Sequence, residues 1–241
     1  MNMAGFRKLQ HLVPPFFRPV VKSLVIRMLP PTVKYEHELA FWKYEWEQDG
    51  RCFKNDYYKG TMLGMAQEED DGFLAGKIVA DFGCGPRGSL VWAKNARLRI
   101  GIDVLTEVYS RFEIRTHDMV YVESSEKQIP LPSGYVDVMF TLNAMDHVVD
   151  LDAMCAEIRR VIVPGGTLIG SFNLDEEPTL CEPQTLTEAQ VKESLLKHFD
   201  IVSYRTAPKG PKGAAYSHFT DNSPPPTSGE RFLWVRATKR V

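Results

Sequence analysis

The segment Val79-Ala80-Asp81-Phe82-Gly83-Cys84-Gly85-Pro86-Arg87-Gly88 carries the strongest local signal of the chain. It reads as a short buried strand over Lys77–Ala80 that runs through a glycine-rich turn into a helix over Arg87–Lys94. Glycines in such a turn let the backbone approach a ligand closely, beside the amides of the helix N-terminus. The next strand, Leu98–Ile102, ends at Asp103, where a carboxylate can accept two hydrogen bonds from a ribose diol. The segment therefore predicts a site for a nucleotide or nucleoside.

Asp81 helps to decide between two candidate ligands, a dinucleotide and a single nucleoside. Gly83, Gly85 and Gly88 satisfy the GxGxxG spacing of dinucleotide sites, but that match alone is weak. The carboxylate of Asp81 precedes the first glycine, where it would repel a pyrophosphate and attract an ammonium group. About eighty residues precede the loop, whereas dinucleotide folds often begin near it. These features favour a cationic amino-acid nucleoside.

Strands and helices alternate after Gly76, which predicts a parallel sheet with helices on both faces. Leu151–Ile162 is expected to be a helix that Pro164-Gly165-Gly166 ends. Thr187-Glu188-Ala189-Gln190 is a capping box that opens a helix to His198. No helix joins the last two strands, so an antiparallel pair is expected there. The chain is thus predicted to be an α/β protein with a mostly parallel seven-stranded sheet, with strands at Lys77–Ala80, Leu98–Ile102, Met119–Val122, Val136–Leu142, Thr167–Phe172, Ile201–Thr206 and Phe232–Thr238.

Composition and charge exclude several classes of protein. The 241 residues are 44% apolar and 25% charged, which excludes a disordered or fibrous chain. The net charge of −2 is uneven, because residues 1–34 hold six basic residues and no acid. This basic arm either rests on an anionic membrane surface or packs on the domain with its charges in water, and the second reading is preferred. Scattered cysteines, no membrane-spanning run and no aromatic-basic pattern for nucleic acid favour a cytoplasmic protein without a disulfide, metal site or nucleic-acid partner.

Two helices are expected before the sheet. From Tyr35 to Gln48, Tyr35, Leu39, Trp42 and Trp46 form one narrow stripe at helical spacing. A second helix, capped by Asn55 or Asp56, is expected to run through Gln67. Core packing is the preferred interpretation of both apolar faces. The functional alternative is that this helical pair covers a ligand pocket and that Tyr57 or Tyr58 reaches into it.

Four groups of residues occur in an order that resembles a known family. The ordered set is similar to the successive motifs of class I S-adenosylmethionine (SAM)-dependent methyltransferases, particularly those acting on small molecules, lipids and sugars. The resemblance is firm over residues 76–172 and looser over the C-terminal helix and strand pair. It implies a Rossmann-like fold. The groups are Asp81-Phe82-Gly83-Cys84-Gly85, Asp103, Ile129-Pro130-Leu131-Pro132 with Val136-Asp137-Val138, and Arg159-Arg160-Val161-Ile162-Val163-Pro164-Gly165-Gly166.

The resemblance also implies which residues hold the cofactor SAM. Gly83 and Gly85 would pass close to its methionine part, with Cys84 as a small residue in the same turn and Asp81 near the ammonium group. Asp103 would bind the ribose hydroxyls, and Val104 would pack under the adenine. Ser125 or Glu126 would contact the adenine amino group, although the sequence leaves that contact ambiguous. Asn143 follows the fourth strand, at the carboxyl edge of the sheet where ligands of such sheets bind.

The segment Asn143-Ala144-Met145-Asp146-His147 is the candidate for the chemistry. Its side chains follow the fourth strand and can face the transferred methyl group. An alcohol acceptor must lose its proton, and the ordinary pKa of histidine suits that task. His147 is therefore a candidate general base, oriented by Asp146. The alternative is that His147 bonds to backbone and only shapes the cofactor pocket.

Together these features predict residues 1–75 as a basic arm with a helical extension and residues 76–241 as a SAM-binding methyltransferase domain. The expected reaction moves a methyl group from SAM to a small-molecule or glycan-like acceptor, most simply at oxygen, and leaves S-adenosyl-L-homocysteine. One alternative is a membrane-peripheral enzyme that methylates a lipid or lipid-linked sugar and uses residues 1–34. A non-catalytic SAM-binding module and a nicotinamide-dependent oxidoreductase are the others. The sequence does not predict the oligomeric state.

Overall fold

Seven strands form one sheet in the order β3-β2-β1-β4-β5-β7-β6. The computed structural model describes residues 14, 21–22, 25–26, 29–208 and 230–241. Neighbouring strands are parallel from β3 through β5, whereas β7 is antiparallel to both β5 and β6. The predicted fold class is therefore confirmed. The strands are β1 Ile78–Phe82, β2 Leu98–Asp103, β3 Val120–Glu123, β4 Val136–Leu142, β5 Ile162–Leu174, β6 Phe199–Pro208 and β7 Arg231–Lys239.

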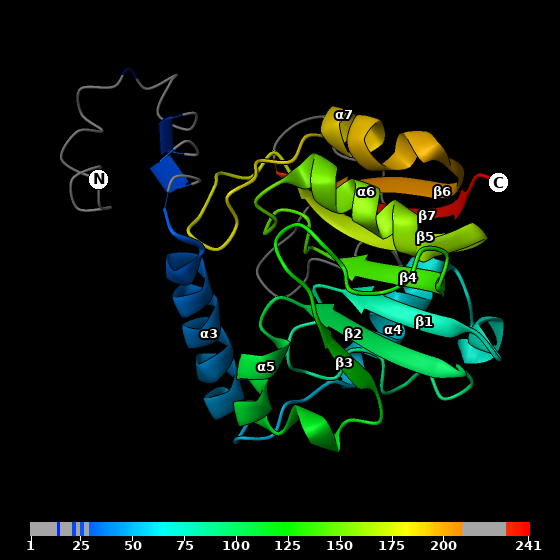
Figure 1. The fold of residues 1–241 in the computed structure, drawn as a ribbon, viewed down its shortest axis with the longest axis horizontal. Coiled ribbons are helices and arrows are strands. Elements are labelled where there is room, and N and C mark those ends of the chain that lie inside the picture. Colours follow the sequence, from blue (N-terminus) through cyan, green and yellow to red (C-terminus); the bar gives the residue numbers. More distant parts are fainter. Residues whose placement is uncertain (1–13, 15–20, 23–24, 27–28, 209–229) are drawn as a thin grey trace.

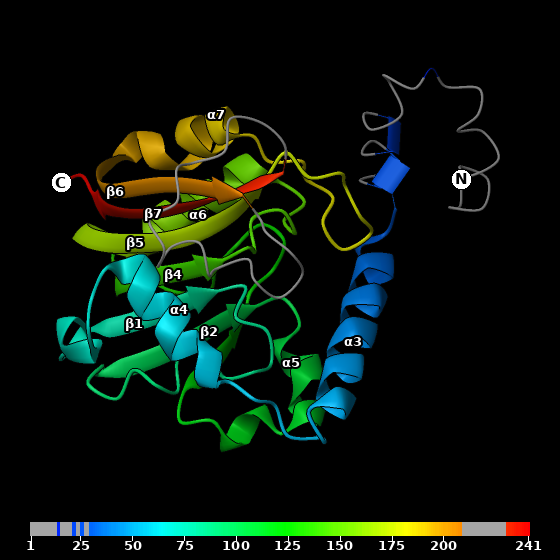
Figure 2. The same cartoon turned by 180° about the vertical axis from the view of Figure 1, so that it is seen from behind.

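Helices cover both faces of this sheet (Figures 1 and 2). Residues of β1 alternate between two cores, since Ile78 and Ala80 pack with α6 while Val79 packs with α4. That alternation is the period of two expected of a strand buried on both faces. The helices are α3 Pro31–Gln48, α4 Asp56–Ala66, α5 Thr106–Tyr109, α6 Leu151–Val161 and α7 Glu188–Gln190, with short 3-10 or π turns at Asp71–Leu74, Ser110–Phe112, Ile114–Thr116, Val191–Leu195 and Leu196–His198.

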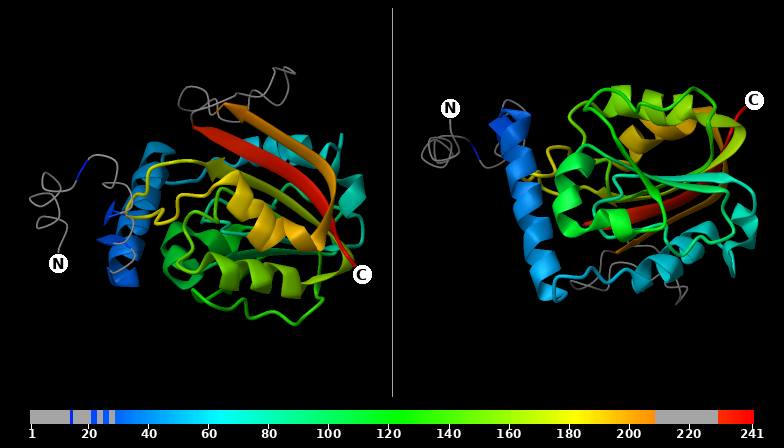
Figure 3. Two further views of the ribbon diagram at one scale, coloured as in Figure 1. Left: turned by 90° about the horizontal axis from the view of Figure 1, so that it is seen from above. Right: turned by 60° about the horizontal axis from the view of Figure 1, so that its bottom comes forward.

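Helix α3 lies apart from the two helical layers and crosses the carboxyl ends of the parallel strands (Figures 1 and 3). Its apolar stripe, which includes Trp42 and Trp46, packs against Tyr109 and Phe112. The rings of Trp42 and Tyr109 meet edge to face with their centroids 6.4 Å apart. The stripe predicted from the sequence therefore does pack on the domain, and it fixes α3 over the edge of the sheet where ligands of α/β folds bind.

The helix expected over Arg87–Lys94 is wrong, because residues 87–94 form a series of turns. Gly88 has a φ of +75° and a Cβ there would lie 2.9 Å from the His117 ring, so the chain leaves the helical region. Ser89 also donates a hydrogen bond to Asp81 at 2.5 Å. No helix N-terminus therefore follows the glycine-rich turn.

Two further predictions concern where helices begin and end. Helix α6 ends at Val161, and β5 begins at once at Ile162, so Pro164-Gly165-Gly166 lies inside the strand. The pairing of β4 with β5 shifts register between Val136 and Val138 to accommodate it. The capping box at Thr187 is confirmed, with its side chain and that of Gln190 bonding reciprocally to backbone.

Most of residues 1–34, and residues 209–229 of the expected long connection, lie outside the described residues. Lys34, the last residue of the predicted basic arm, is buried in α3 and is paired with Glu126. Among the helices that the structure describes, none combines the length and the apolar character needed to cross a bilayer. Membrane contact by residues 1–34, the cytoplasmic location and the domain boundary at residue 75 stay predictions.

Candidate functional site

A pocket of about 760 Å³, counted with its opening to solvent, lies at the carboxyl ends of β1, β2 and β4 beneath α3. Most of the residues predicted to bind a cofactor line it, whereas Asp81 lies behind the wall. The lining residues are Lys34, Glu38, Trp42, Tyr58, Phe82, Gly83, Cys84, Gly85, Asp103, Val104, Ser124, Ser125, Glu126, Leu142, Asn143, Ala144, His147, Val148 and Met154.

The turn after β1 supplies backbone rather than side chains to the pocket. Gly83 has a φ of +73°, and a Cβ there would lie 2.1 Å from the Cβ of Ala144. At Gly85 a Cβ would lie 2.6 Å from the indole of Trp42. Only glycine fits at either position. Cys84 between them is buried, and burial raises the pKa of its thiol well above the ordinary value, so it is a packing residue and not a nucleophile.

Asp103 is fixed by two backbone amides. Its Oδ2 accepts from Gly85 N at 3.1 Å and its Oδ1 from Leu105 N at 3.0 Å, so the carboxylate connects β2 to the glycine turn. Each oxygen keeps a lone pair for a ligand. Burial, together with the nearby carboxylate of Glu38, raises the pKa of Asp103 to about 7.

Asp81 adds a second buried carboxylate at the end of β1. Its Oδ2 accepts from Ser89, but its Oδ1 is buried without a hydrogen-bond partner among the described residues. Burial, with a smaller contribution from Asp103, raises the pKa of Asp81 to about 7. Two buried carboxyl groups with pKa values of about 7 are only partly ionised at neutral pH, and a bound cation would favour their ionised forms. The close backbone turn, the ribose-type carboxylate of Asp103 and this negative potential fit SAM, whose methionine part carries a positive charge.

Glu126, predicted at the adenine end, is bonded by residues of α3. Its Oε1 accepts from Lys34 Nζ at 2.8 Å and from the Tyr35 hydroxyl at 2.7 Å. Ser125 also lines the pocket, and its Oγ accepts from Gln128 N at 3.0 Å. Val104, Ser125 and Glu126 all line the pocket, and Ser124 lines it with them. Which of them contacts adenine stays a prediction.

His147 also lines the pocket, and three carboxylates surround it. Glu38 Oε2 lies 3.8 Å from Nδ1, while Asp146 Oδ1 and Glu182 Oε1 lie 4.0 and 3.9 Å from Nε2. Burial disfavours the charged imidazole, but these carboxylates outweigh it and raise the pKa of His147 to about 9. His147 is then protonated at neutral pH in the unliganded pocket and holds no lone pair for a proton. In this state His147 cannot accept a proton from an acceptor, so its predicted role as general base would require it to lose its own proton first.

Asn143 is held in a strained conformation beside His147. Its φ is +47°, a region that asparagine tolerates better than most residues. The side-chain Oδ1 accepts from Ser171 Oγ at 3.0 Å, and Asn143 N donates to Ser171 O at 2.9 Å. These bonds tie the turn after β4 to β5, so that the segment 143–147 forms one wall of the pocket.

The residues that sequence reasoning missed come mainly from α3. Lys34, Glu38 and Trp42 line the pocket from a helix whose apolar stripe was interpreted as core packing. The alternative in which this region covers a ligand pocket is the arrangement observed, and Tyr58 of α4 reaches the pocket while Tyr57 is half exposed. Polar residues one turn apart beside the stripe, Lys34 and Glu38, were the available signal.

A buried arginine attaches the far end of α3 to the glycine turn. Arg87 donates to Asp49 Oδ2 at 2.5 Å, to Glu45 Oε2 at 2.7 Å and to the carbonyl of Lys54 at 3.0 Å. Its guanidinium also lies 4.9 Å from the centre of the Phe53 ring, within cation–π range. The turn that was expected to begin a helix therefore serves to anchor the helix above it.

Comparison with protein families matches residues 80–170 to the family described as "Methyltransferase domain". An uncharacterised 37.1 kDa protein of a Streptomyces fradiae transposon is 37% identical over 119 residues, 46% of this chain and 33% of that protein. A sterol 24-C-methyltransferase of Gibberella zeae is 24% identical over 146 residues, 55% of this chain and 38% of that protein. The alignments thus span about a third of the length of these curated relatives.

Solved structures share the fold across most of the chain. A [4+2]-cyclase, SpnF, superposes with a TM-score of 0.62 at 18% identity and covers 87% of this chain and 95% of its own. A geranyl diphosphate C-methyltransferase of Streptomyces coelicolor, in complex with Mg²⁺ and S-adenosyl-L-homocysteine, gives 0.51 at 17% identity over 73% of this chain and 78% of its own. At these identities the likeness concerns the fold, which hosts more than one reaction.

Proposed function

We propose that this chain, which contains a methyltransferase domain of the class I SAM-dependent family, transfers a methyl group from SAM to a small-molecule acceptor. The family match over residues 80–170 and the seven-stranded fold support the donor. One observation carries the proposal furthest: the buried carboxylate of Asp103 is bonded to the amide of Gly85, and a second buried carboxylate, Asp81, lies on the neighbouring strand. Asp103 presents a ribose-type acceptor to the pocket, and the negative potential of Asp81 acts from behind the pocket wall.

The residues of the pocket have distinct proposed roles. SAM supplies an electrophilic methyl group on a positively charged sulfur. Asp103 holds the ribose hydroxyls, Asp81 attracts the ammonium group, and the backbone at Gly83 and Gly85 accommodates the methionine part. Helix α3 covers the pocket and excludes water, while Asn143 and His147 line the end where an acceptor would bind. Orientation of the reacting groups supplies most of the rate in such a transfer.

Two observations favour an acceptor with an apolar portion over a glycan. The matched relatives and structures include enzymes named for sterols and for geranyl diphosphate. A second pocket of about 490 Å³ adjoins the first at Lys34. Its walls are mainly apolar and comprise Ile26, Leu29, Pro30, Pro31, Val33, Val149, Leu180 and Pro183. Methylation at oxygen, the glycan-like acceptor and the membrane-peripheral enzyme remain open alternatives within this proposal.

A second candidate function is SAM binding without methyl transfer. The structure with TM-score 0.62 is named as a [4+2]-cyclase, so the fold also supports a reaction of another class. Formation of S-adenosyl-L-homocysteine distinguishes the two candidates, because only methyl transfer produces it. Incubation with SAM and a panel of sterol, isoprenoid and sugar acceptors should release it with at least one acceptor; a protein that binds SAM and releases none across the panel favours the second candidate.

Calorimetric titration tests the donor site directly. SAM and S-adenosyl-L-homocysteine should bind to the wild-type chain, whereas NAD should not, because the negative potential of Asp103 and Asp81 would repel its pyrophosphate. Asp103→Ala should abolish binding of both nucleosides. Asp118→Ala is a matched control, since Asp118 is a surface carboxylate paired with Arg99 at 2.8 Å. Binding of NAD, or SAM binding that survives Asp103→Ala unchanged, would contradict the proposed site.

A further inference from the structure

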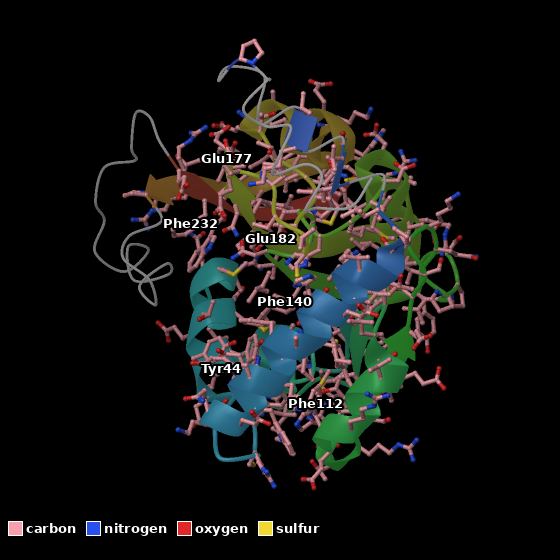
Figure 4. All side chains as sticks on the ribbon, turned by 90° about the vertical axis from the view of Figure 1, so that its left-hand side faces the viewer. Tyr44, Phe112, Phe140, Glu177, Glu182 and Phe232 are labelled. Carbon is pink, nitrogen blue, oxygen red and sulfur yellow. The ribbon has the colours of Figure 1, made fainter. Side chains whose placement is uncertain are left out.

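Three potential metal ligands converge at His147, which lines the pocket, although the sequence predicted no metal site. They are Asp146, His147 and Glu182, whose ligand atoms all lie within 4.8 Å of one another. The first two follow β4, and Glu182 belongs to the loop between β5 and α7 (Figure 4). His147 Nε2 faces both carboxylates at about 4 Å. With two of these separations near 4 Å and the third within 4.8 Å, the three atoms lie at most about 2.5 Å from a common point, which is within the range of bond lengths of divalent cations.

Asp146 provides a second, independent indication of a ligand. The residue is only 4% exposed, and its Oδ1 is buried without a hydrogen-bond partner in the part of the chain that the structure describes. Its other oxygen lies 3.4 Å from Asn173 Nδ2. A buried carboxylate oxygen with no donor is costly. Oδ1 points towards His147, where a cation would satisfy it.

The surrounding residues orient Glu182 towards His147 as well. Thr179 Oγ1 donates to Glu182 Oε2 at 2.8 Å and accepts from Glu182 N at 3.0 Å, which leaves Oε1 facing His147. Gln184 N donates to the carbonyl of Asp146 at 3.1 Å, so the loop is fastened to the turn after β4. These contacts act before any ion binds, as expected of groups that orient metal ligands.

Glu38 of α3 completes the arrangement from the opposite side of the imidazole. Its Oε2 lies 3.8 Å from His147 Nδ1, so a proton is favoured on Nδ1 and the lone pair of Nε2 faces the two carboxylates. A carboxylate behind a ligating histidine is a recurring feature of metal sites. We propose that Asp146, His147 and Glu182 bind a divalent transition-metal ion such as Mn²⁺ or Zn²⁺ beside the wall of the pocket that His147 lines.

The donor set determines which ions should bind best. The imidazole nitrogen suits Zn²⁺, and the two carboxylate oxygens suit both Zn²⁺ and Mn²⁺, whereas Mg²⁺ and Ca²⁺ prefer oxygen ligands alone. Three protein ligands leave coordination positions for water or for a ligand oxygen. Resting on the proposed function, the ion would select an acceptor with a hydroxyl, carboxylate or phosphate oxygen. In this arrangement His147 Nε2 bonds to the ion and does not act as a general base.

Titration of the metal-free full-length chain with Mn²⁺, followed by calorimetry and electron paramagnetic resonance without SAM, tests the site. We expect one bound ion per chain, with nitrogen coupling in the resonance signal that disappears in His147→Ala. Glu182→Gln should weaken binding at least tenfold. Glu177→Gln is the matched control, because Glu177 is an exposed carboxylate on the same loop, labelled in Figure 4, and it should leave the affinity unchanged.

Several outcomes would overturn the metal site. Absence of Mn²⁺ and Zn²⁺ binding, or equal effects of Glu182→Gln and Glu177→Gln, would do so. Mg²⁺ binding as tight as Mn²⁺ binding, with no nitrogen coupling, would remove His147 from the ligands. A variant of the buried Asp146, such as Asp146→Asn, could fail to fold. Glu182→Gln changes a partly exposed residue and keeps the test valid in that case. Failure of SAM titration would not affect these results, so the metal site and the methyltransferase proposal are tested separately.

Discussion

Binding of SAM should strengthen as the pH rises from 6 to 8. The pKa of Asp103 and that of Asp81 are both raised to about 7, mainly because the two carboxyl groups are buried. Below pH 7 each is therefore mostly protonated and neutral, so the attraction for the cationic ligand is weak. Above pH 7 both are mostly ionised. The sign is opposite for the unliganded fold, whose stability should fall over the range from pH 4 to 7, because the buried carboxyl groups hold protons that the unfolded chain releases.

The size of the effect follows from the ionised fraction. A carboxyl group with a pKa of 7 is about one-tenth ionised at pH 6 and about nine-tenths ionised at pH 8. If one ionised carboxylate is required, the affinity rises about tenfold over these two pH units. If both Asp81 and Asp103 must ionise, the limit is about a hundredfold. We therefore expect a rise between these two values.

Calorimetry of SAM binding at half-unit pH intervals, in two buffers of different ionisation enthalpy, measures both the affinity and the protons released. Asp103→Asn should weaken binding and reduce the slope, since one of the two titrating groups is gone. Asp118→Asn should leave the profile unchanged. A wild-type affinity that stays constant between pH 6 and 8, with no proton release, would show that these carboxylates are already ionised and would refute the reasoning.

Two substitutions test the packing around the pocket. Gly83→Ala places a Cβ 2.1 Å from that of Ala144 and should cost about 1–3 kcal/mol in unfolding free energy and remove SAM binding. The control Gly76→Ala should retain binding, because Gly76 has a similar φ of +71° but open space around it. Equal losses for the two variants in urea unfolding and SAM titration would rule out the contact as the cause. Arg87→Ala leaves Asp49 and Glu45 without their partner. It should lower the unfolding free energy by about 2 kcal/mol, a value between those of exposed and buried pairs, and should speed hydrogen exchange in α3. Arg240→Ala breaks an exposed pair with Asp200 and should lower it by less than about 1 kcal/mol, so similar losses in the two variants would argue against a special anchoring role for Arg87.

The parts of the fold that were predicted best are those whose pattern is local. Strand β4 has the bounds expected from its apolar run, Val136–Leu142, and the capping box at Thr187 needs only four residues. The helix over Arg87–Lys94 failed because Gly88, Ser89 and Arg87 make contacts with residues distant in sequence. Arg87 bonds to α3 some forty residues earlier, and such tertiary contacts override local helix propensity.

In the candidate site too, the residues in local motifs could be predicted from the sequence, whereas those brought in by tertiary packing could not. The glycine turn and Asp103 could be located because two adjacent parallel strands end at one edge, and the amide of Gly85 does meet Asp103. Lys34 meets Glu126 across 92 residues, and Glu182 reaches His147 from a loop without a motif. No spacing rule connects these segments, because the position of α3 and of that loop depends on how their surfaces pack after the sheet has formed.

Helix α3 has a kinetic consequence that follows from its position over the pocket. We expect a ligand bound beneath it to leave faster when contacts such as Trp42 on Gly85 and Lys34 on Glu126 separate. The lifetime of the bound nucleoside is then set by how often the helix lifts and not by affinity alone. Release of the spent nucleoside would limit turnover whenever this opening is slower than the chemical step. Loosening α3 would consequently raise the maximal rate while it lowers the occupancy of the pocket.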